Sequence, residues 1–217
     1  MAGGRSGAAQ RRAKANVGAT GIIATAERLF AEQGINAVSL RQVAAASGLA
    51  NHYSVQYHFS DRKGLLRAIF EERLPVIDRR RQELFDQLTA EQRNELAALF
   101  DCTHRPLLEA ALDAHKSNFA RLLIQVIRDP EYRELRNTYA ELTPCGYEIA
   151  ARMRRLLPQV APELRNLRLT VATGILLDAI ADPTMYGFLG EDGEAADPGR
   201  AYEVALVAAL GSLQAPG

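Results

Sequence analysis

A stretch of polar and aromatic side chains after Gly48 stands out because it contains no carboxylate. Its outward-facing positions are expected to be Asn51, His52, Tyr53, Ser54, Gln56 and Tyr57. Amides and hydroxyls pair with base edges in the major groove of DNA, whereas carboxylates would meet repulsion from the phosphates. An ordinary solvent-facing helix usually carries Glu and Lys, and this stretch carries neither. Its composition therefore favours a DNA-reading helix over a plain helical hairpin.

Two short helices joined at a glycine are expected to position this stretch. Ser39 can cap a helix over 40–47, because its hydroxyl can accept from the free amides of the first turn. Ala44 is small enough to let a second helix, over 51–58, approach closely. Gly48 lies between them and can adopt the positive φ of a sharp turn. This is the pattern of a helix-turn-helix.

The remaining sequence is helical in character nearly throughout. Ala, Leu, Glu, Gln and Arg dominate, and the period-two alternation of strands is absent. A first helix over 19–33 is expected to end at Gly34. Later helices are expected over 61–87, 92–113, 115–128, 131–156, 162–187 and 198–214, with Pro75 and Pro106 kinking or interrupting two of them. The expected fold is all-α, with an N-terminal three-helix helix-turn-helix domain and a larger helical domain.

The charges of the chain cancel overall but are unevenly distributed. Residues 1–63 contain eight Lys and Arg against three Asp and Glu, a net charge of +5. The remainder contains 18 basic and 23 acidic residues, a net charge of −5. Residues 1–17 are rich in Gly, Ala and Arg without apolar periodicity, which predicts a disordered basic tail. A basic N-terminal part indicates contact with a polyanion there, with a chance distribution as the alternative.

Several other classes of protein find no support in the sequence. No apolar run approaches the roughly 18–20 residues that a membrane span needs, and the N-terminus lacks the apolar region of a secretory signal. Cys102 and Cys145 are too few for a disulfide framework, and no Cys or His cluster suggests a metal site. The sequence contains no recognisable glycine-rich phosphate-binding loop and no Ser/His/Asp arrangement of a catalytic site. A cytoplasmic protein that is not an enzyme and holds neither cofactor nor metal is expected.

Residues from about 19 to 70 resemble the N-terminal domain of the TetR family of regulators. The matching run is a helix, then FAEQGINAVSLRQVAAASGL, a recognition helix, and YHFSDRKGLL. Two features depart from the family's pattern. The segment from Gly48 to Phe59, eleven residues on, is one residue longer than usual. The tyrosine common three positions before that phenylalanine is replaced by Gln56, with Tyr57 next to it.

The resemblance implies roles in binding a palindromic DNA operator. Asn51, His52, Tyr53 and Ser54 are expected at base edges, and Tyr57 or Tyr53 is expected to take over the usual tyrosine–phosphate contact. Further phosphate contacts are implied for Ser39, Arg41, Arg62 and Lys63, although helix capping alone would explain Ser39. Arg11, Arg12 and Lys14 in the tail are expected to reach the minor groove or the backbone.

The resemblance also divides the chain after the tail into a DNA-binding domain over 18–62 and an effector-binding and dimerisation domain over 63–217. A pocket for a small apolar effector needs an apolar lining with a few placed polar groups. Polar or soft side chains within otherwise apolar helices are the candidates for its lining. They are Cys102, His115, Phe119, Gln125, Tyr139, Thr143, Tyr147, Thr173 and Met185.

The final two helices carry more apolar residues than one buried face needs. These are Leu169, Val171, Ile175, Leu176 and Ile180 in the first, and Val204, Leu206, Val207, Leu210 and Leu213 in the second. Helices that are apolar over so much of their circumference predict a homodimer held by an intermolecular four-helix bundle. Burial within one chain is the alternative.

The favoured function is a homodimeric, ligand-responsive repressor. In it, two recognition helices enter successive major grooves, and an effector favours a conformation in which they lose the required separation. An all-helical carrier or enzyme, whose first helices are merely structural, is the alternative from another class. An activator or a ligand-independent architectural binder also fits the sequence.

Overall fold

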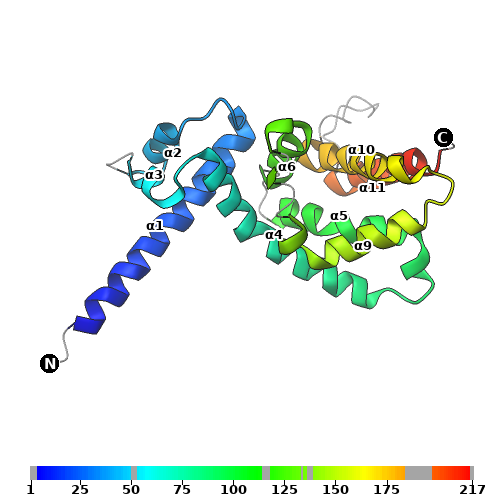
Figure 1. Cartoon of the computed structure of the whole chain (residues 1–217), viewed down its shortest axis with the longest axis horizontal. Helices are drawn as coiled ribbons and strands as arrows, with labels where there is room; N and C mark the ends of the chain where they lie inside the picture. Colours follow the sequence, from blue (N-terminus) through cyan, green and yellow to red (C-terminus); the bar gives the residue numbers. More distant parts are fainter. Residues whose placement is uncertain are drawn as a thin grey trace. The chain divides into compact units, whose positions relative to one another are not determined.

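The computed structural model describes residues 4–49, 53–113, 118–132, 134–135, 139–183 and 197–215, and of residues 4–17 it describes only the backbone. Every regular element in these ranges is a helix (Figure 1), as the sequence predicts. The chain forms two compact units, a first unit over Met1–Glu72 and a second unit over Arg73–Gly217. One helix, α4 (Arg62–Gln87), begins in the first unit and ends in the second.

The first unit consists of three helices and the beginning of α4 (Figure 1). The three are α1 (Gly4–Gln33), α2 (Leu40–Ala46) and α3 (Tyr53–Phe59). Each of the four helices contributes fully buried aliphatic or aromatic side chains to one small core, among them Ile22, Phe30, Val43, Val55 and Phe70. The short helices α2 and α3 contact each other directly, which gives the predicted helix-turn-helix.

The turns of the first unit follow the predicted glycine chemistry. Gly34 closes α1 with a φ of 93°, and Gly48 follows α2 with a φ of 70°. The amide of Leu49 donates to the carbonyl of Ala44, and that of Gly48 donates to the carbonyl of Ala45, both at 3.1 Å. These two hydrogen bonds form a Schellman motif, which satisfies the last free carbonyls of α2.

The first helix begins earlier than predicted. α1 starts at Gly4 instead of residue 19, because Ala, Arg and Gln in this stretch are strong helix formers. Residues 1–3 and the side chains of Arg11, Arg12 and Lys14 lie outside the described part of the chain. The DNA contacts expected of these three side chains therefore stay a prediction.

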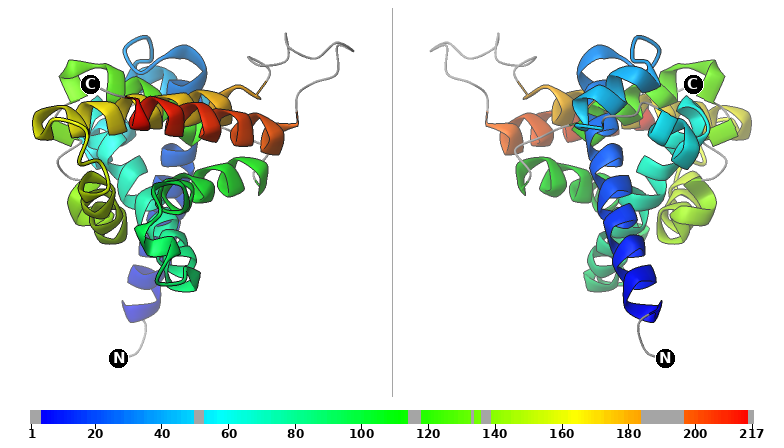
Figure 2. Two further views of the ribbon diagram at one scale, coloured as in Figure 1. Left: turned by 90° about the vertical axis from the view of Figure 1, so that its right-hand side faces the viewer. Right: turned by 90° about the vertical axis from the view of Figure 1, so that its left-hand side faces the viewer.

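The second unit is built from the remainder of α4 and a set of further helices (Figure 2). They are η1 (Gln92–Asn94), α5 (Leu96–Asp113), α6 (Asn118–Arg128), η2 (Pro130–Tyr132), α8 (Tyr139–Leu142), α9 (Pro144–Arg155), α10 (Pro162–Ala181) and α11 (Pro198–Gln214). α10 and α11 pack side by side along their lengths, and α5 and α6 both pack against α10. In the ranges that are described, no helix combines the length and hydropathy needed to cross a bilayer.

Two predicted helices are interrupted in ways that the sequence interpretation missed. The expected helix over 131–156 is wrong, since it is divided at Thr143, whose φ and ψ are −134° and 61°. Pro144 follows and disfavours the α conformation of the residue before it, so that α9 begins at the proline itself. The expected helix over 92–113 is likewise divided, at Glu95, which is extended.

Three other prolines differ in their effects on the helices. Pro75 and Pro106 lie inside α4 and α5 without interrupting either helix, because each removes a single backbone donor from a long helix. A kink at either proline stays a prediction. α10 ends at Ala181 and not at residue 187, since Asp182 precedes Pro183 and leaves the helical conformation. Residues 184–187 lie outside the described part.

Candidate nucleic-acid interface and ligand cavity

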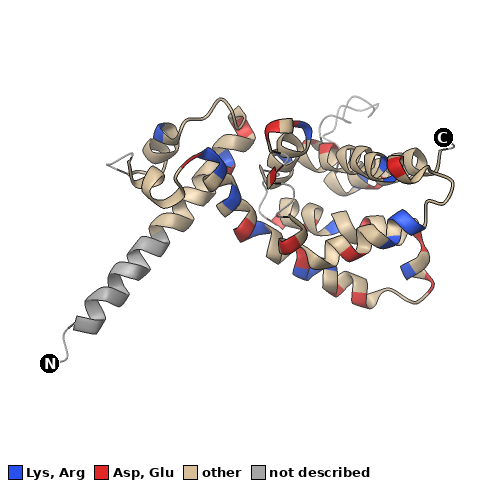
Figure 3. Ribbon diagram, viewed as in Figure 1, with Lys and Arg blue, Asp and Glu red and all other residues tan. Residues whose placement is uncertain are grey.

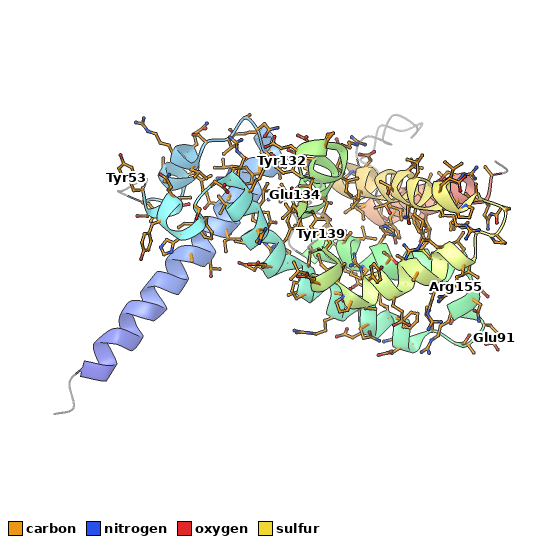
Figure 4. The ribbon with its side chains drawn as sticks, viewed as in Figure 1. Tyr53, Glu91, Tyr132, Glu134, Tyr139 and Arg155 are labelled. Atoms are coloured by element: carbon orange, nitrogen blue, oxygen red, sulfur yellow. The ribbon has the colours of Figure 1, made fainter. Side chains whose placement is uncertain are left out.

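The exposed face of α3 carries the large side chains expected to contact DNA. Val55 and Phe59 point into the core, where they are 0% and 9% exposed. Tyr53 and Tyr57 are 63% and 86% exposed, and Figure 4 shows Tyr53 on the outside of the first unit. Gln56 is exposed as well. The spacing of Val55 and Phe59 by one helical turn therefore leaves the opposite face free for a partner.

Other predicted residues of this segment have different surroundings. Ser54 is half-buried, and Asn51 and His52 lie outside the described residues. His58 is exposed, and its ring lies edge-on to that of Tyr57 with the centroids 5.4 Å apart. The base contacts predicted for Asn51, His52 and Ser54 stay predictions.

Ser39 forms the predicted cap of α2. Its Oγ accepts from the amide of Gln42 at 3.3 Å, and its own amide donates to Oε1 of Gln42 at 2.8 Å. The Ser39 hydroxyl also donates to the same Oε1, at 2.7 Å. This reciprocal capping box occupies the hydroxyl, so capping accounts for a serine at this position without a phosphate contact.

Arg41 lies one residue beyond the start of α2 and is exposed. In the residues that the structure describes, its guanidinium makes no hydrogen bond or ion pair. Lys63, at the second position of α4, is also exposed. Together with Tyr53, Gln56 and Tyr57 they make up what we call the reading surface, which contains two cations and no carboxylate.

Arg62 has a different position from the one expected of a phosphate contact. Its Nε and Nη2 donate to the carbonyl of Val38, at 3.3 and 3.1 Å. Nη1 reaches Oδ1 of Asn36 at 3.5 Å. Arg62 thus ties the beginning of α4 to the loop before α2, and its donors are directed into the protein. We therefore interpret it as a residue that positions α2.

The turn between α3 and α4 is unusually tight. Ser60 has a φ of 62°, and the Asp61 carboxylate accepts from the amide of Gly64 at 2.7 Å, so that Asp61 caps the first turn of α4. A Cβ atom at Gly64 would lie only 2.0 Å from the carbonyl oxygen of Phe59. The sequence interpretation did not single out this glycine, since only the folded backbone reveals the close approach.

The second unit contains a cavity of about 510 Å³. Leucine and isoleucine side chains form much of its lining, and a few hydroxyls, one histidine and one arginine supply polar groups, as in many small-molecule sites. The lining residues are Leu74, Arg81, Thr103, His104, Leu107, Leu123, Ile127, Tyr139, Ala140, Thr143, Gly146, Tyr147, Thr173 and Leu177.

Four of the predicted pocket residues line this cavity, namely Tyr139, Thr143, Tyr147 and Thr173. Figure 4 labels Tyr139 at the beginning of α8. Three others do not line it. Cys102 and Phe119 are buried elsewhere in the core, and Gln125 is half-buried. His115 and Met185 lie outside the described residues.

His104 was missed by the sequence interpretation, although it is the most buried polar group of the lining at 2% exposure. Its Nδ1 donates to the carbonyl of Phe100 at 2.8 Å, so the neutral ring must accept at Nε2. The Thr173 hydroxyl, 3.1 Å away, is the donor to that nitrogen. A histidine four residues after Phe100 on an apolar helix face could have indicated this arrangement.

Burial of His104 predicts a loss of stability in acid. Burial lowers its pKa from 6.5 to about 4. The unfolded chain therefore binds the proton more readily, and stability falls as pH decreases from 6.5 towards 4, by about 3 kcal/mol at the lower limit. Urea unfolding over this range measures it. In His104→Gln this part of the pH dependence should disappear; equal pH profiles of the two proteins would contradict the prediction.

Arg81 of the cavity lining belongs to a buried ion pair with Asp78. Nη1 of Arg81 lies 3.6 Å from Oδ1 of Asp78, and both side chains are at most 10% exposed. Nε of Arg81 donates to the carbonyl of Thr103 at 2.8 Å. The two oxygens of Asp78 accept from the amides of Cys145 and Gly146, at 3.0 and 2.9 Å. Asp78 on α4 thus caps the first turn of α9, which makes α4, α5 and α9 interdependent.

Part of the apolar surface of α10 and α11 is not covered by the chain itself. Val171, Val204 and Val207 are 53%, 52% and 72% exposed, and Figure 3 shows few charged residues along the two helices. Ile175, Leu206 and Leu210 are half-buried. Leu169, Leu176, Ile180 and Leu213 are instead buried within the chain. The predicted apolar excess is therefore divided between the core of one chain and an exposed strip.

Two family profiles match most of this sequence. The profile described as "Bacterial regulatory proteins, tetR family" matches residues 22–69, which contain the helix-turn-helix. The profile described as "Tetracyclin repressor-like, C-terminal domain" matches residues 101–211, about half of the chain. No curated protein matches the chain.

Alignments with several solved structures extend over nearly the whole chain. PfmR, a TetR family transcriptional regulator from Thermus thermophilus, is 20% identical over 90% of this chain and 95% of its own, with a TM-score of 0.46. A TetR-family regulator from Pectobacterium atrosepticum is 22% identical over 95% and 99%, with a TM-score of 0.43. NalD, the secondary repressor of the MexAB-OprM multidrug efflux pump in Pseudomonas aeruginosa, is 20% identical over 92% and 96%, with a TM-score of 0.42.

Proposed function

Because the chain belongs to the TetR family of bacterial regulatory proteins, we propose that it is a dimeric repressor whose DNA binding is controlled by a small apolar molecule. The chain is a DNA-binding transcriptional regulator and not an enzyme. The observation that carries the repressor proposal is the reading surface. This surface combines two exposed cations and three large polar side chains from α2, α3 and the beginning of α4, and it contains no carboxylate.

We assign the residues of the reading surface to different kinds of DNA contact. Gln56 has an amide that can pair with a base edge from the exposed face of α3. Arg41 and Lys63 bring positive charge suited to phosphates, as does the positive end of the α4 dipole beside Lys63. Tyr57, the most exposed aromatic side chain of α3, is our candidate for the tyrosine–phosphate contact.

The cavity supports control by a ligand. Leu74 and Arg81 in its lining belong to α4, and the same helix supplies Lys63 to the reading surface. A molecule that prefers one position of α4 can therefore change the DNA affinity, but only by the ratio of its affinities for the two conformations. We propose that effector binding favours the conformation that binds DNA weakly.

Selection of bound duplexes from a random library tests the repressor proposal. We expect an inverted repeat to be enriched, since a twofold dimer reads two half-sites. The selected site, placed between a promoter and a reporter gene, should lower expression when the protein is present. Unchanged or raised expression at an occupied site would contradict repression and leave an activator or architectural binder.

Arg41→Ala is expected to weaken binding of the selected duplex without changing sequence preference. Arg41 is assigned to a phosphate, and the proposed dimer carries two copies of it. Their removal should lower the slope of log affinity against log salt by about two. Titration by fluorescence anisotropy at several salt concentrations measures this slope. Arg79→Ala, which removes an equally exposed cation from the second unit, is the matched control. Equal slopes for both variants would contradict the assignment.

Val207→Glu is expected to convert a dimer into a monomer. Val207 is the most exposed apolar residue of α11, and a carboxylate there would be buried without a partner in a helix bundle between two chains. Operator affinity should fall about 100-fold, because the two DNA-binding domains are no longer linked in one dimer and cannot bind the operator together. Sedimentation velocity measures the change from dimer to monomer. Val76→Glu, at a 62% exposed valine on α4, should remain dimeric; a dimeric Val207→Glu would place the interface elsewhere.

A further inference from the structure

Arg81, which lines the cavity, has N–H donors that form no hydrogen bond within the described part of the chain. An arginine side chain offers five N–H groups. Nε uses one for the carbonyl of Thr103, and Nη1 approaches Asp78 only at ion-pair distance, 3.6 Å. In the part of the chain that is described, no hydrogen bond reaches Nη2. Since Arg81 lines the cavity, these donors are available to an acceptor that a bound molecule supplies.

The position of the guanidinium is fixed by its neighbours. The Thr103 carbonyl and the Asp78 carboxylate hold it from two sides. Gly146 leaves it room, because a Cβ atom at this position would lie 3.0 Å from Nη1 of Arg81 and 3.3 Å from Oδ1 of Asp78. The donor that remains is therefore held in place before a ligand arrives, which lowers the entropic cost of binding.

The charges around Arg81 indicate which kind of acceptor fits. The Asp78 carboxylate already balances the guanidinium, and it also accepts from two amides of α9. His104 is neutral near pH 7, because burial lowers its pKa to about 4. The remaining lining groups are hydroxyls and apolar side chains. A carboxylate brought into this cavity would be a buried charge without its own counter-ion, which is unfavourable.

We propose that the effector is an uncharged, mostly apolar molecule with a carbonyl oxygen that accepts a hydrogen bond from Nη2 of Arg81. Its apolar part packs against Leu74, Leu107, Leu123 and Leu177. The inference rests on the effector-binding function proposed above, and it adds the chemical class of the ligand and the residue that recognises it. Arg81 is then the link between ligand chemistry and α4, the helix that enters the first unit.

Three molecules with the same pair of phenyl rings test the proposal. They are benzophenone, which has a ketone; diphenylmethane, which has no oxygen; and diphenylacetate, which has a carboxylate. Each is titrated against the full-length protein loaded with N-phenyl-1-naphthylamine, an uncharged fluorescent probe for apolar sites. A hydrogen bond to a charged donor predicts that benzophenone displaces the probe at a concentration about tenfold lower than diphenylmethane does. Diphenylacetate should be weaker than benzophenone.

The double variant Asp78→Asn/Arg81→Met removes the donor together with its counter-ion. The double variant should still bind the probe, but its affinities for benzophenone and diphenylmethane should be equal. The control Arg79→Met should keep the tenfold preference for benzophenone. If the unaltered protein does not prefer the ketone, or binds diphenylacetate best, the proposed ligand class is wrong although the cavity binds ligands. If it does not bind the probe at all, the effector function itself fails. Titrations of the unaltered protein with the three molecules test the proposal by themselves, even if the double variant is unstable.

Discussion

Gly64→Ala is expected to destabilise the first unit by about 3 kcal/mol and to abolish specific DNA binding. The new Cβ would lie 2.0 Å from the carbonyl oxygen of Phe59, and backbone cannot move aside as a flexible side chain can. The turn between α3 and α4 must therefore open. Opening it displaces Phe59 from the core and breaks the 2.7 Å cap between Asp61 and Gly64. Because α3 and the beginning of α4 carry four of the five residues of the reading surface, opening of the turn should also disrupt the DNA contacts.

Urea unfolding and anisotropy with a selected duplex measure the two effects of Gly64→Ala. Gly21→Ala is the matched control, since Gly21 lies inside α1 and a Cβ there meets nothing within 4 Å. Alanine at an open helical position should raise stability by about 1 kcal/mol and leave DNA binding unchanged. Equal behaviour of the two variants would show that the α3–α4 turn is not constrained as the structure indicates.

The first unit was largely predictable because local chemistry determines it. The capping residue Ser39, the turn glycines Gly34 and Gly48, and the inward pair Val55 and Phe59 each act through neighbours close in sequence. The roles of Arg62 and Gly64 were not predictable in this way. Arg62 binds a carbonyl 24 residues earlier, and Gly64 matters only because a particular carbonyl points at it. Both depend on how the helices pack.

The second unit was less predictable for related reasons. Its helix count depended on Pro144, which divides a segment with continuous helical periodicity and was overlooked. Four pocket residues could be found as polar groups on apolar helices, but Arg81 and His104 could not be distinguished from surface charges or core residues by type alone. Arg81 and Arg79 are two residues apart on α4, and only the packing of α5 and α9 makes the first buried.

Asp78→Ala is expected to cost the second unit about 3–5 kcal/mol, the usual result of removing one partner of a buried ion pair. The variant leaves the Arg81 guanidinium buried without its counter-ion. It also leaves the amides of Cys145 and Gly146 without their acceptor at the start of α9. Burial already lowers the pKa of Arg81, and the charge of Asp78 opposes this effect. The carboxylate therefore stabilises both the charge of Arg81 and the first turn of α9.

A double-mutant cycle in urea unfolding distinguishes this coupling from a simple loss of packing. The single variants of the cycle are Asp78→Asn and Arg81→Met. Each should be strongly destabilising, because each leaves the charge of the other residue buried without its partner. Asp78→Asn/Arg81→Met should recover most of the loss, since no buried charge remains and the asparagine can still accept from one amide of α9. Glu83→Ala breaks the exposed Arg80–Glu83 pair, 3.0 Å apart, and should cost less than about 1 kcal/mol. Additive single effects in the cycle would mean that Asp78 and Arg81 stabilise the unit independently, and the carboxylate would then act only as the cap of α9.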